Sequence, residues 1–466
     1  MLSAALRGEL VKILGKGNVS FEREALVSYS YDAMNRKYPP DGVAFPGGAG
    51  DISRILKMAN RENFPVVPRG AGTGFTGGSL PIEGGLTLSL ERMRNIREID
   101  AENLTADVEP GVITGDLQAE AESRGLFYPP DPTSVKFSTI GGNIAENSGG
   151  PRAIKYGVTR DYVLGLEVVM PTGEIVFTGT RKTLKGVVGY DLTRLIVGSE
   201  GTLGVVTRAF LRLLPLPPAQ KTMLITFKSL EDAAGAVSSI INAKIVPATL
   251  EIMDSVCLRC VEEYVKAGFG GVEAVLLVEV DGREDGVGAD VEDIRRISTE
   301  NKAVGFRVAS TKNEVKDIWR VRRNVSPSLN RVRPNKLNED VVVPRSRLVE
   351  LVRGIRGIAE TRGVLIASFG HAGDGNIHVN VMFDKTNADE TGRGEDAVKD
   401  IFELTLSLGG TISGEHGIGI AKLPYLSMEL TPDTIEVMRK IKRTLDPNGI
   451  LNPGKIFSKE RSPGYI

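Results

Sequence analysis

The sequence predicts an α+β protein of two or three domains, and three observations support this. The chain has 466 residues, more than a single hydrophobic core usually serves. Short stretches of alternating apolar residues are interleaved with stretches of helical periodicity, above all after the proline-rich segment 215–218. A glycine-rich loop near the N-terminus leads into a strand and not into a helix, which excludes a Rossmann fold.

The first predicted elements surround that loop. Asp51–Glu62 has the apolar periodicity of a helix, and Phe64–Pro68 reads as a short buried strand that runs into residues 69–78. This loop holds five glycines and two threonines, and Leu86–Leu90 is the next strand. Consecutive backbone N–H groups in such a loop form a nest for an anion, and a pyrophosphate is the expected ligand. The alternative is an ordinary glycine-rich hairpin loop.

Two further segments, 131–150 and 198–204, combine glycine with small hydroxyl and amide side chains. Glycine permits close approach of a ligand to the backbone, so these segments suggest one extended polar ligand threaded through a domain. Between them, Val163–Val176 is predicted to form a hairpin around Pro171–Gly173.

Beyond residue 218 the predicted strands and helices alternate. The strands are Thr222–Phe227, Ala248–Met253 and Ala274–Val280, and the helices are Ser229–Asn242 and Asp290–Asn301, with another helix at Pro432–Leu445. Ser229 is the expected N-cap of its helix. We expect antiparallel pairing here, not a parallel nucleotide-binding sheet.

Composition excludes several classes of protein. The net charge is −1 with both signs mixed, so we expect no nucleic-acid partner. Two cysteines, Cys257 and Cys260, exclude a disulfide framework and are read as buried apolar residues. No apolar run approaches the ~18 residues of a transmembrane segment, and Leu2–Leu14 lacks the features of a signal peptide. We therefore expect a cytoplasmic protein, with membrane association through a partner left open.

Histidine is the most informative residue, because the chain has only three, at 371, 378 and 416. Predicted strands 364–369 and 376–383 are joined by a glycine turn, so His371 and His378 can approach each other in a hairpin. Glu415, from a distant loop, would be the third ligand. Two histidines and one glutamate are typical of a catalytic zinc-type site with an open position.

His416 is then left to act as a base. The alternative for these residues is a set of hairpin histidines with hydrogen-bonding roles only.

Together the motifs resemble those of the FAD-linked oxidase family, most closely its branch of glycolate oxidases and D-lactate dehydrogenases. The resemblance covers roughly Tyr29 to Phe457. It rests on the segments 69–78, 139–150 and 198–204, the GHxGDGNxH and GEHGIG stretches at 370–378 and 414–419, and the NPGK at 452–455.

The resemblance implies a PCMH-type FAD-binding domain, as in vanillyl-alcohol oxidase, at residues 1–217. It further implies a ferredoxin-like, antiparallel-sheet cap domain at 218–425 and a segment, 426–466, that returns to the FAD domain. The implied cofactor-binding residues are Arg69, Gly70, Ala71, Gly72, Thr73, Gly74, Gly77, Gly78, Pro132, Thr139, Gly142, Asn143, Ser148, Gly149, Gly150, Glu200, Gly204, Val206 and Asn452. Because residues 1–370 contain no histidine to tether a flavin, we expect non-covalent FAD.

By the same resemblance, His371, His378 and Glu415 hold a divalent metal, Zn or Mn, and His416 is the general base. Arg322, in a W-x-x-R stretch, would bind the substrate carboxylate; the alternative is that it lies on the solvated face of a basic helix. Lys336 is a weaker candidate, because its surroundings depart from the spacing of the hydroxyglutarate branch.

The implied function is FAD-dependent oxidation of a small D-2-hydroxy acid, D-lactate or glycolate, to the 2-oxo acid, with hydride passing to flavin N5. No iron–sulfur, haem or second nucleotide motif is present, so the electrons would leave to an iron–sulfur protein partner, an electron-transfer flavoprotein or a quinone. The alternatives are a D-2-hydroxyglutarate dehydrogenase, a transferase like alkylglycerone-phosphate synthase, and a non-enzymatic electron-relay protein.

Overall fold

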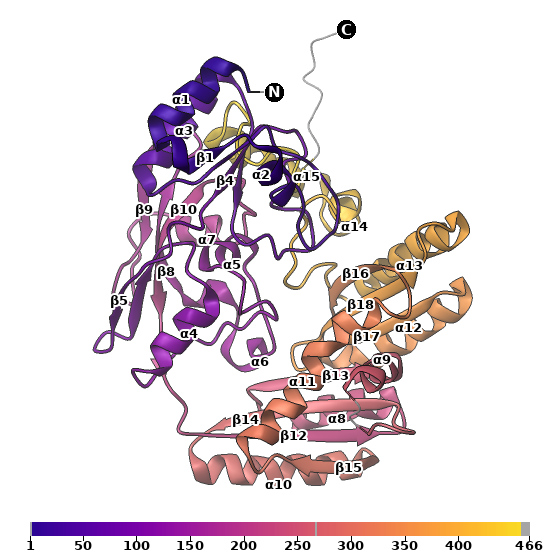
Figure 1. Ribbon diagram of the computed structural model, residues 1–466. Coiled ribbons are helices and arrows are strands. Elements are labelled where there is room, and N and C mark those ends of the chain that lie inside the picture. The colour runs from indigo at the N-terminus through magenta and orange to yellow at the C-terminus, as the bar shows by residue number, and fades with distance from the viewer. Residues whose placement is uncertain (1, 266–267, 458–466) are drawn as a thin grey trace. The chain divides into compact units, whose positions relative to one another are not determined.

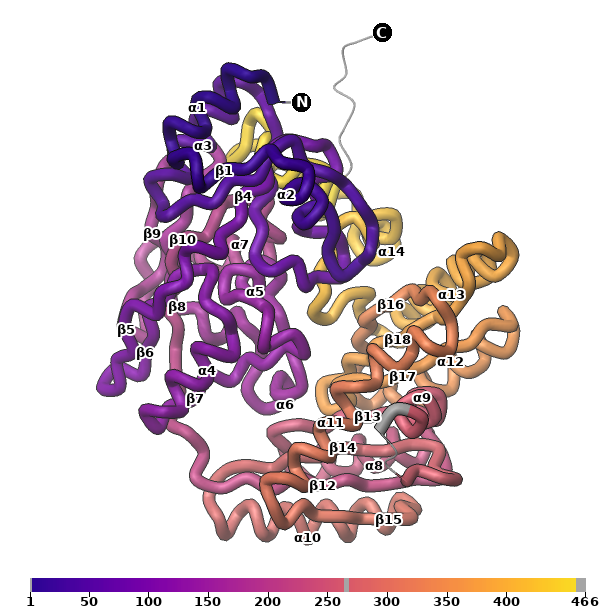
Figure 2. The backbone as a smooth tube through the Cα atoms, in the orientation of Figure 1, coloured from indigo at the N-terminus to yellow at the C-terminus, as the bar shows by residue number. Residues whose placement is uncertain are grey.

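The computed structural model describes residues 2–265 and 268–457, and the chain divides into two compact units. Unit 1 consists of Met1–Ser148, Val158–Leu216 and Glu415–Ile466. Unit 2 consists of Gly149–Gly157 and Pro217–Gly414. The chain therefore enters unit 2 twice, at Gly149–Gly157 and at Pro217–Gly414, and its path can be followed in the backbone trace of Figure 2.

Unit 1 begins with a four-stranded sheet in the order β1-β2-β4-β3. Its strands are β1 (Val19–Ser20), β2 (Gly42–Ala44), β3 (Val66–Arg69) and β4 (Leu86–Ser89), and both β2 and β3 run parallel to β4. Residues 450–452 run beside β3, where the Val66 N–H donates to the Ile450 carbonyl at 2.8 Å.

Helices α1 (Ala4–Leu14) and α3 (Ala49–Glu62) lie side by side in this unit (Figure 1). The predicted apolar face of α3 is confirmed, because Ile52, Ile55, Leu56 and Ala59 are all buried in one hydrophobic cluster. Burial of this stripe is what holds a short amphipathic helix against the sheet.

A five-stranded antiparallel sheet completes unit 1, in the order β5-β6-β10-β8-β9. The strands are β5 (Ile96–Asp100), β6 (Thr105–Val108), β8 (Val163–Val169), β9 (Ile175–Gly179) and β10 (Val205–Arg212). The predicted hairpin is confirmed as β8–β9. In addition to α1 and α3, the helices of unit 1 include α4 (Thr114–Glu122), α5 (Ile140–Glu146), α7 (Leu192–Ile196) and α15 (Pro432–Leu445).

Unit 2 is built on a seven-stranded antiparallel sheet in the order β15-β12-β14-β13-β17-β18-β16. Its strands are β12 (Ala219–Phe227), β13 (Thr249–Asp254), β14 (Ala274–Gly282), β15 (Ala303–Val308), β16 (Asn335–Val342), β17 (Leu365–His371) and β18 (Asn376–Phe383). The expected antiparallel sheet of the cap region is confirmed.

Two helices, α9 (Ser255–Val265) and α11 (Lys312–Leu329), pack together on one face of this sheet around Met253, Leu277 and Phe369. A second group consists of α8 (Leu230–Asn242), α10 (Glu284–Glu300), α12 (Leu348–Arg362) and α13 (Ala388–Ser407) (Figure 1). In this group α8 contacts both α10 and α12, and α12 contacts α13. Cys257 and Cys260 are free and buried in α9, as expected.

The predicted ends of two helices in unit 2 can be compared with the structure. Ser229 is the N-cap of α8 and accepts from the Asp232 N–H at 3.2 Å, as predicted. The helix expected from Asp290 begins instead at Glu284, because Val287 and Val291 extend its buried stripe although Gly286 and Gly288 weaken its helix propensity. Among the described residues, none of the helices combines the length and the apolar composition that a bilayer crossing requires.

Candidate active site

The β17–β18 hairpin brings two histidines together in unit 2. His371 ends β17 and His378 lies early in β18, opposite Phe369. Both side chains are buried, their ring centroids are 5.1 Å apart, and the two Nε2 atoms are 3.4 Å apart. The approach expected from the glycine turn is therefore present, and both imidazoles direct a nitrogen at a common point.

The side-chain alternation of the strands gathers further polar groups on the same sheet face. His378 is opposite Asp340 of β16, and the pairing of Ile252 with Gly370 places Glu251 of β13 beside His371. This is the face that α9 and α11 cover, since Phe369 belongs to their cluster. Neighbouring strands thus carry a buried polar row inside an apolar layer.

Glu251 is the member of this row that sequence reasoning missed. It is fully buried, it contacts His371 Nδ1, and it accepts from the Nε of Arg322 at 2.5 Å. Burial raises the pKa of a carboxyl group, but the neighbouring Arg322 and His371 outweigh it and lower the pKa of Glu251 to about 2. The only sequence signal was an acid in the middle of the buried strand β13.

Arg322 lies on α11 with 3% of its surface exposed, so the alternative of a solvated face is wrong for this residue. Its guanidinium carbon is 4.6 Å from the centroid of the Phe369 ring, and its Nε is used by Glu251. Its Nη2 donates to no acceptor in the part of the chain that the structure describes. A buried donor of this kind is costly unless a ligand accepts from it.

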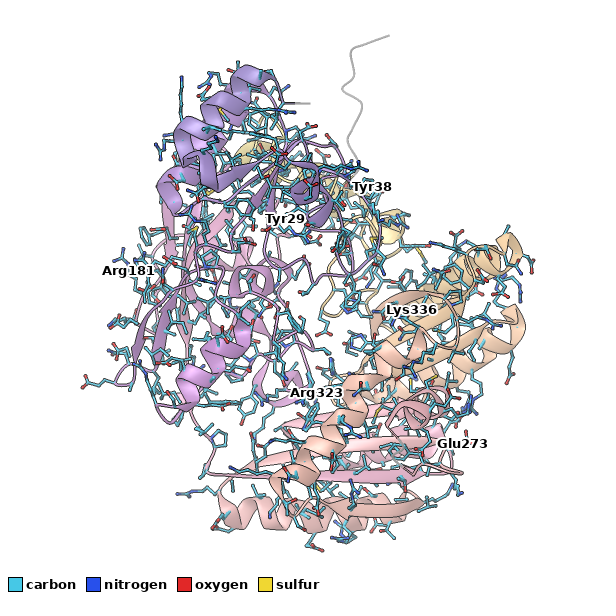
Figure 3. All side chains as sticks on the ribbon, viewed as in Figure 1. Tyr29, Tyr38, Arg181, Glu273, Arg323 and Lys336 are labelled. Atoms are coloured by element: carbon cyan, nitrogen blue, oxygen red, sulfur yellow. The ribbon has the colours of Figure 1, made fainter. Side chains whose placement is uncertain are left out.

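Lys336 of β16, labelled in Figure 3, lies on the same sheet face as Asp340, four positions earlier in the strand. Its Nζ donates to Ser326 Oγ at 2.8 Å, and burial lowers the pKa of Lys336 to about 8. Arg322 and Ser326 are one helical turn apart on α11. The guanidinium of Arg322 on the helix and the ammonium of Lys336 on the sheet therefore lie along the same stretch of α11.

Glu415 and His416 follow the last residue of unit 2, Gly414, whose N–H donates to Asp340 Oδ2 at 2.8 Å. His371, His378 and Glu415 each offer a ligand atom, and these atoms lie within 4.8 Å of one another. Two imidazole nitrogens and a carboxylate oxygen form a donor set that suits Zn or Mn.

His416 belongs to unit 1 and lies against the predicted pyrophosphate loop. Its carbonyl accepts from Thr76 Oγ1 at 3.2 Å, and its ring centroid is 5.1 Å from that of Phe75. The predicted base therefore contacts the loop that we expect to hold the cofactor, through one hydrogen bond and one ring contact.

That loop, residues 69–78, begins at the last residue of β3, and residues 70–85 connect β3 to β4 without a helix, as predicted. Within the described chain, none of the backbone N–H groups from Ala71 to Ser79 donates to a protein acceptor. Gly72 and Gly77 have φ of +69° and +80°, in the region that favours glycine, and Gly77 and Gly78 are buried. Buried amides without acceptors in such a loop suit an anionic ligand, so the residues present fit the pyrophosphate of FAD.

The other predicted cofactor segments of unit 1 converge on this loop. A Cβ added at Gly78 would lie 2.9 Å from Glu146 Oε1, and one at Gly70 would overlap the Thr139 hydroxyl. The amide of Asn452 donates to the carbonyls of Gly78 and Glu200 at 2.8 Å each. Four segments that are far apart in the sequence therefore meet here.

Several predicted cofactor residues use their side chains within the protein. Glu200 accepts from the N–H groups of Ile418 and Gly419 at 2.7 Å, and burial raises its pKa. Asn143 donates to Thr114 at 2.6 Å, and Arg69 donates to the Tyr31 carbonyl at 2.9 Å.

The remaining residues of the predicted set are placed as follows. Thr139 caps α5 through the Gly142 N–H, the Pro132 carbonyl accepts from Val135, and Val206 pairs with Val168 two residues after Gly204. Ser148 is the last residue of its segment in unit 1, whereas Gly149 and Gly150 belong to unit 2.

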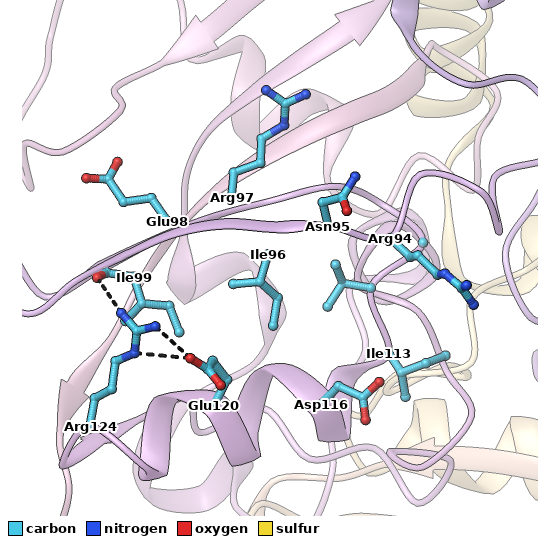
Figure 4. Close-up of a pocket in the computed structure, with 12 residues that line it drawn as sticks. Arg94, Asn95, Ile96, Arg97, Glu98, Ile99, Ile113, Asp116, Glu120 and Arg124 are labelled. Atoms are coloured by element: carbon cyan, nitrogen blue, oxygen red, sulfur yellow. Dashed lines mark hydrogen bonds and ion pairs between the residues drawn. The ribbon is translucent and has the colours of Figure 1, made fainter.

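A separate cleft of about 640 Å³ lies in unit 1 between β5 and α4 (Figure 4). None of the predicted site residues lines it. Two of its three arginines are already paired, Arg97 with Glu109 and Arg124 with Glu120 and the Ile99 carbonyl. Part of its charged lining is therefore committed to ion pairs within the protein.

Two family profiles match this chain. The profile described as FAD linked oxidases, C-terminal domain, matches residues 216–456, and the profile described as FAD binding domain matches residues 40–179. The first covers more than half of the chain. The chain belongs to the FAD-linked oxidase family.

This FAD-linked oxidase has relatives that match over nearly their whole length. It is 48% identical to the glycolate oxidase subunit GlcD of Bacillus subtilis, over 99% of this chain and 98% of the relative. It is 37% identical to GlcD of Escherichia coli K12, over 93% and 87%. It is also 36% identical to a D-lactate dehydrogenase of Anaerostipes hadrus, over 92% and 94%.

Solved structures support the PCMH-type fold of this FAD-linked oxidase. p-Cresol methylhydroxylase has a TM-score of 0.80 at 18% identity, covering 98% of both chains. Alkyldihydroxyacetonephosphate synthase has a TM-score of 0.77 at 20% identity, covering 97% of this chain and 86% of the other. At these identities the likeness shows the fold alone. The family and the FAD-binding profile together make the chain an FAD-dependent oxidoreductase.

Proposed function

We propose that this enzyme oxidises a D-2-hydroxy acid, D-lactate or glycolate, to the 2-oxo acid. The observation that carries the proposal is the buried pair of His371 and His378 with Glu415 beside it, in a chain of the FAD-linked oxidase family. Its relatives are named glycolate oxidase subunits and D-lactate dehydrogenases, which supports a hydroxy acid substrate. The transferase alternative has only a distant fold likeness behind it.

Each part of the reaction has residues suited to it. Bound FAD supplies a two-electron acceptor, and a divalent ion supplies a Lewis acid toward the substrate hydroxyl. His416 accepts the hydroxyl proton as general base. Arg322 binds the substrate carboxylate through Nη2, the edge that Glu251 leaves open, and this fixes which hydrogen of C2 can leave.

The proposal extends to partner and place. Because relatives are named as subunits, we propose that an iron–sulfur protein of the same assembly accepts the electrons; an electron-transfer flavoprotein or a quinone is the alternative. We place the protein in the cytoplasm, where its two free cysteines stay reduced.

Anaerobic mixing of the purified holoprotein with hydroxy acids tests this function. Wild-type protein and His416→Ala are each mixed with D-lactate, glycolate, D-2-hydroxyglutarate and L-lactate, and loss of the visible absorbance of oxidised flavin is followed. We expect D-lactate or glycolate to bleach the wild-type flavin and a chelator to slow the reaction. His416→Ala should keep its flavin but react about 10²-fold to 10⁴-fold more slowly, the usual contribution of a general base.

Two outcomes would contradict this account. Bleaching of His416→Ala at the wild-type rate would remove the proposed base. Wild-type flavin that no hydroxy acid reduces would remove the proposed function and favour an electron-relay protein.

A further inference from the structure

Glu251 joins two residues that the proposed function uses separately. One of its oxygens contacts His371 Nδ1, and the other accepts from Arg322 Nε. The carboxylate is fully buried, so it is stable only because both oxygens have strongly polar partners. Its two partners come from different elements, the neighbouring strand β17 and the helix α11 that packs on this face, so the carboxylate links the sheet to the helix.

The contact with His371 determines which ring nitrogen is available. A carboxylate beside Nδ1 favours the proton on that atom, which leaves Nε2 as the nitrogen able to bind a metal. This is the nitrogen that faces His378 Nε2, at 3.4 Å. Glu251 therefore fixes both the tautomer and the orientation of the ring.

The contact with Arg322 fixes the orientation of the guanidinium group. Glu251 holds Nε, and the Phe369 ring lies 4.6 Å from the guanidinium carbon. With the plane fixed in this way, Nη2 is the buried donor that no described residue accepts from. A donor that is already oriented loses less entropy when a carboxylate binds to it.

We infer that Glu251 is a shared positioning residue: one carboxylate sets the metal-binding nitrogen of His371 and the carboxylate-binding edge of Arg322. The inference rests on the proposed function and adds a coupling to it. Loss of this one side chain should weaken metal binding and substrate binding together, although Glu251 contacts neither ligand.

Glu279 offers a matched control. It lies on the neighbouring strand β14, opposite Thr249, on the same face of the sheet and 2% exposed. It accepts from Thr222 at 2.6 Å and from the Nε1 of Trp319, one turn before Arg322 on α11, at 2.8 Å. Glu279→Gln therefore removes a buried carboxylate from the same helix–sheet interface without touching His371 or Arg322.

The test uses the full-length flavoprotein freed of metal with a chelator. The Kd for Zn²⁺ is measured by competition with a chromogenic chelator in wild type, Glu251→Gln and Glu279→Gln, and KM for the hydroxy acid is measured after reloading. Flavin content and the melting temperature report on folding. We expect Glu251→Gln to bind Zn²⁺ about 10-fold to 100-fold more weakly, the usual effect of removing such a partner, and to have a raised KM. Glu279→Gln should stay close to wild type in both.

The outcomes separate this inference from the proposed function. A wild-type protein that binds no metal overturns both. Tight metal binding by wild type and an equal Kd in folded Glu251→Gln overturns the inference alone, as does an equal loss in Glu279→Gln. If Glu251→Gln does not fold, Glu251→Asp takes its place: its carboxylate is one methylene shorter, so unchanged Kd and KM in that variant would also overturn the inference.

Discussion

At the scale of single residues, the site is a set of ionisable groups that would be unstable alone in an apolar layer. Glu251, Arg322, His371 and His378 are all at most 5% exposed, and each lies beside another of the set. Such groups are stable in the interior only when they compensate one another or bind a ligand. The arrangement is therefore better explained by binding chemistry than by stability.

Lys336 should give the protein a specific pH dependence. Burial lowers its pKa from the ordinary 10.5 to about 8. Between these two values the unfolded chain holds a proton that the folded chain has lost, so the free energy of unfolding rises as the pH rises through this window. The gain is at most about 1.4 kcal/mol per pH unit.

Lys336→Met removes the titrating group and should remove this rise. We expect urea unfolding at pH 8 and pH 9.5 to show the wild type gaining roughly 1.5 kcal/mol relative to the variant over that interval. The same pH dependence in both proteins would contradict the lowered pKa of Lys336.

Site residues could be predicted from the sequence where their residue type is rare in the chain. Three histidines in two short stretches pointed to His371, His378 and His416, and the glycine turn allowed the pairing of the first two to be predicted. Glu251 carried no such signal, because its partner is 120 positions away and their contact depends on the pairing of β13 with β17. Strand register over that distance cannot be read from local pattern.

At the scale of elements, local signals worked where local forces decide the structure. The hairpin β17–β18, the hairpin β8–β9 and the capped helix α8 were all predicted from their turn or cap residues. Strand β16 was not predicted, because Asn335–Val342 begins with mostly polar residues. It is a strand because it pairs along its whole length with β18, which is a tertiary effect.

The glycine loop of unit 1 gives a prediction about two neighbouring positions. A Cβ at Gly77 would lie 2.7 Å from Ile420, at a φ that side chains rarely adopt, so Gly77→Ala should destabilise the flavin-free protein by about 1–2 kcal/mol. A Cβ at Gly74 has only Glu146 within 4 Å, so Gly74→Ala should leave that stability unchanged.

The affinity of the Gly74→Ala variant for FAD distinguishes an effect on cofactor binding from an effect on stability. If the loop amides hold the pyrophosphate, Gly74→Ala should still weaken FAD binding, because the methyl group lies where the ligand approaches. Melting temperatures of the flavin-free variants and FAD titrations measure the two effects. Unchanged FAD affinity in Gly74→Ala would argue against the proposed cradle.

At the scale of the whole molecule, the order of motifs along the chain allowed the family to be predicted, and the comparisons confirmed it. The division into units was harder to predict in detail. Residues 149–157 belong to unit 2, although the predicted cofactor segment 139–150, whose first ten residues lie in unit 1, extends into them. Their assignment depends on contacts with distant residues, such as Lys155 and Tyr156 with Asp281.

The absence of histidine before residue 371 leads to a prediction about the cofactor. Without a histidine in the flavin-binding segments to form a covalent bond, FAD should be released when the protein is precipitated with acid. We expect a yellow supernatant and a colourless pellet. Flavin that stays with the washed pellet would show a covalent link through another side chain.

The short stretch around Glu415 has one more consequence. The N–H of Gly414 is bound to Asp340 in unit 2, and the carbonyl of His416 is bound to Thr76 in unit 1, so the chain passes from one unit to the other across a single residue. An insertion or deletion here would change the length of extended chain between those two bonded residues by about 3.8 Å for each residue, the spacing of consecutive Cα atoms. Lineages of this enzyme should therefore keep a single residue between the two bonded positions.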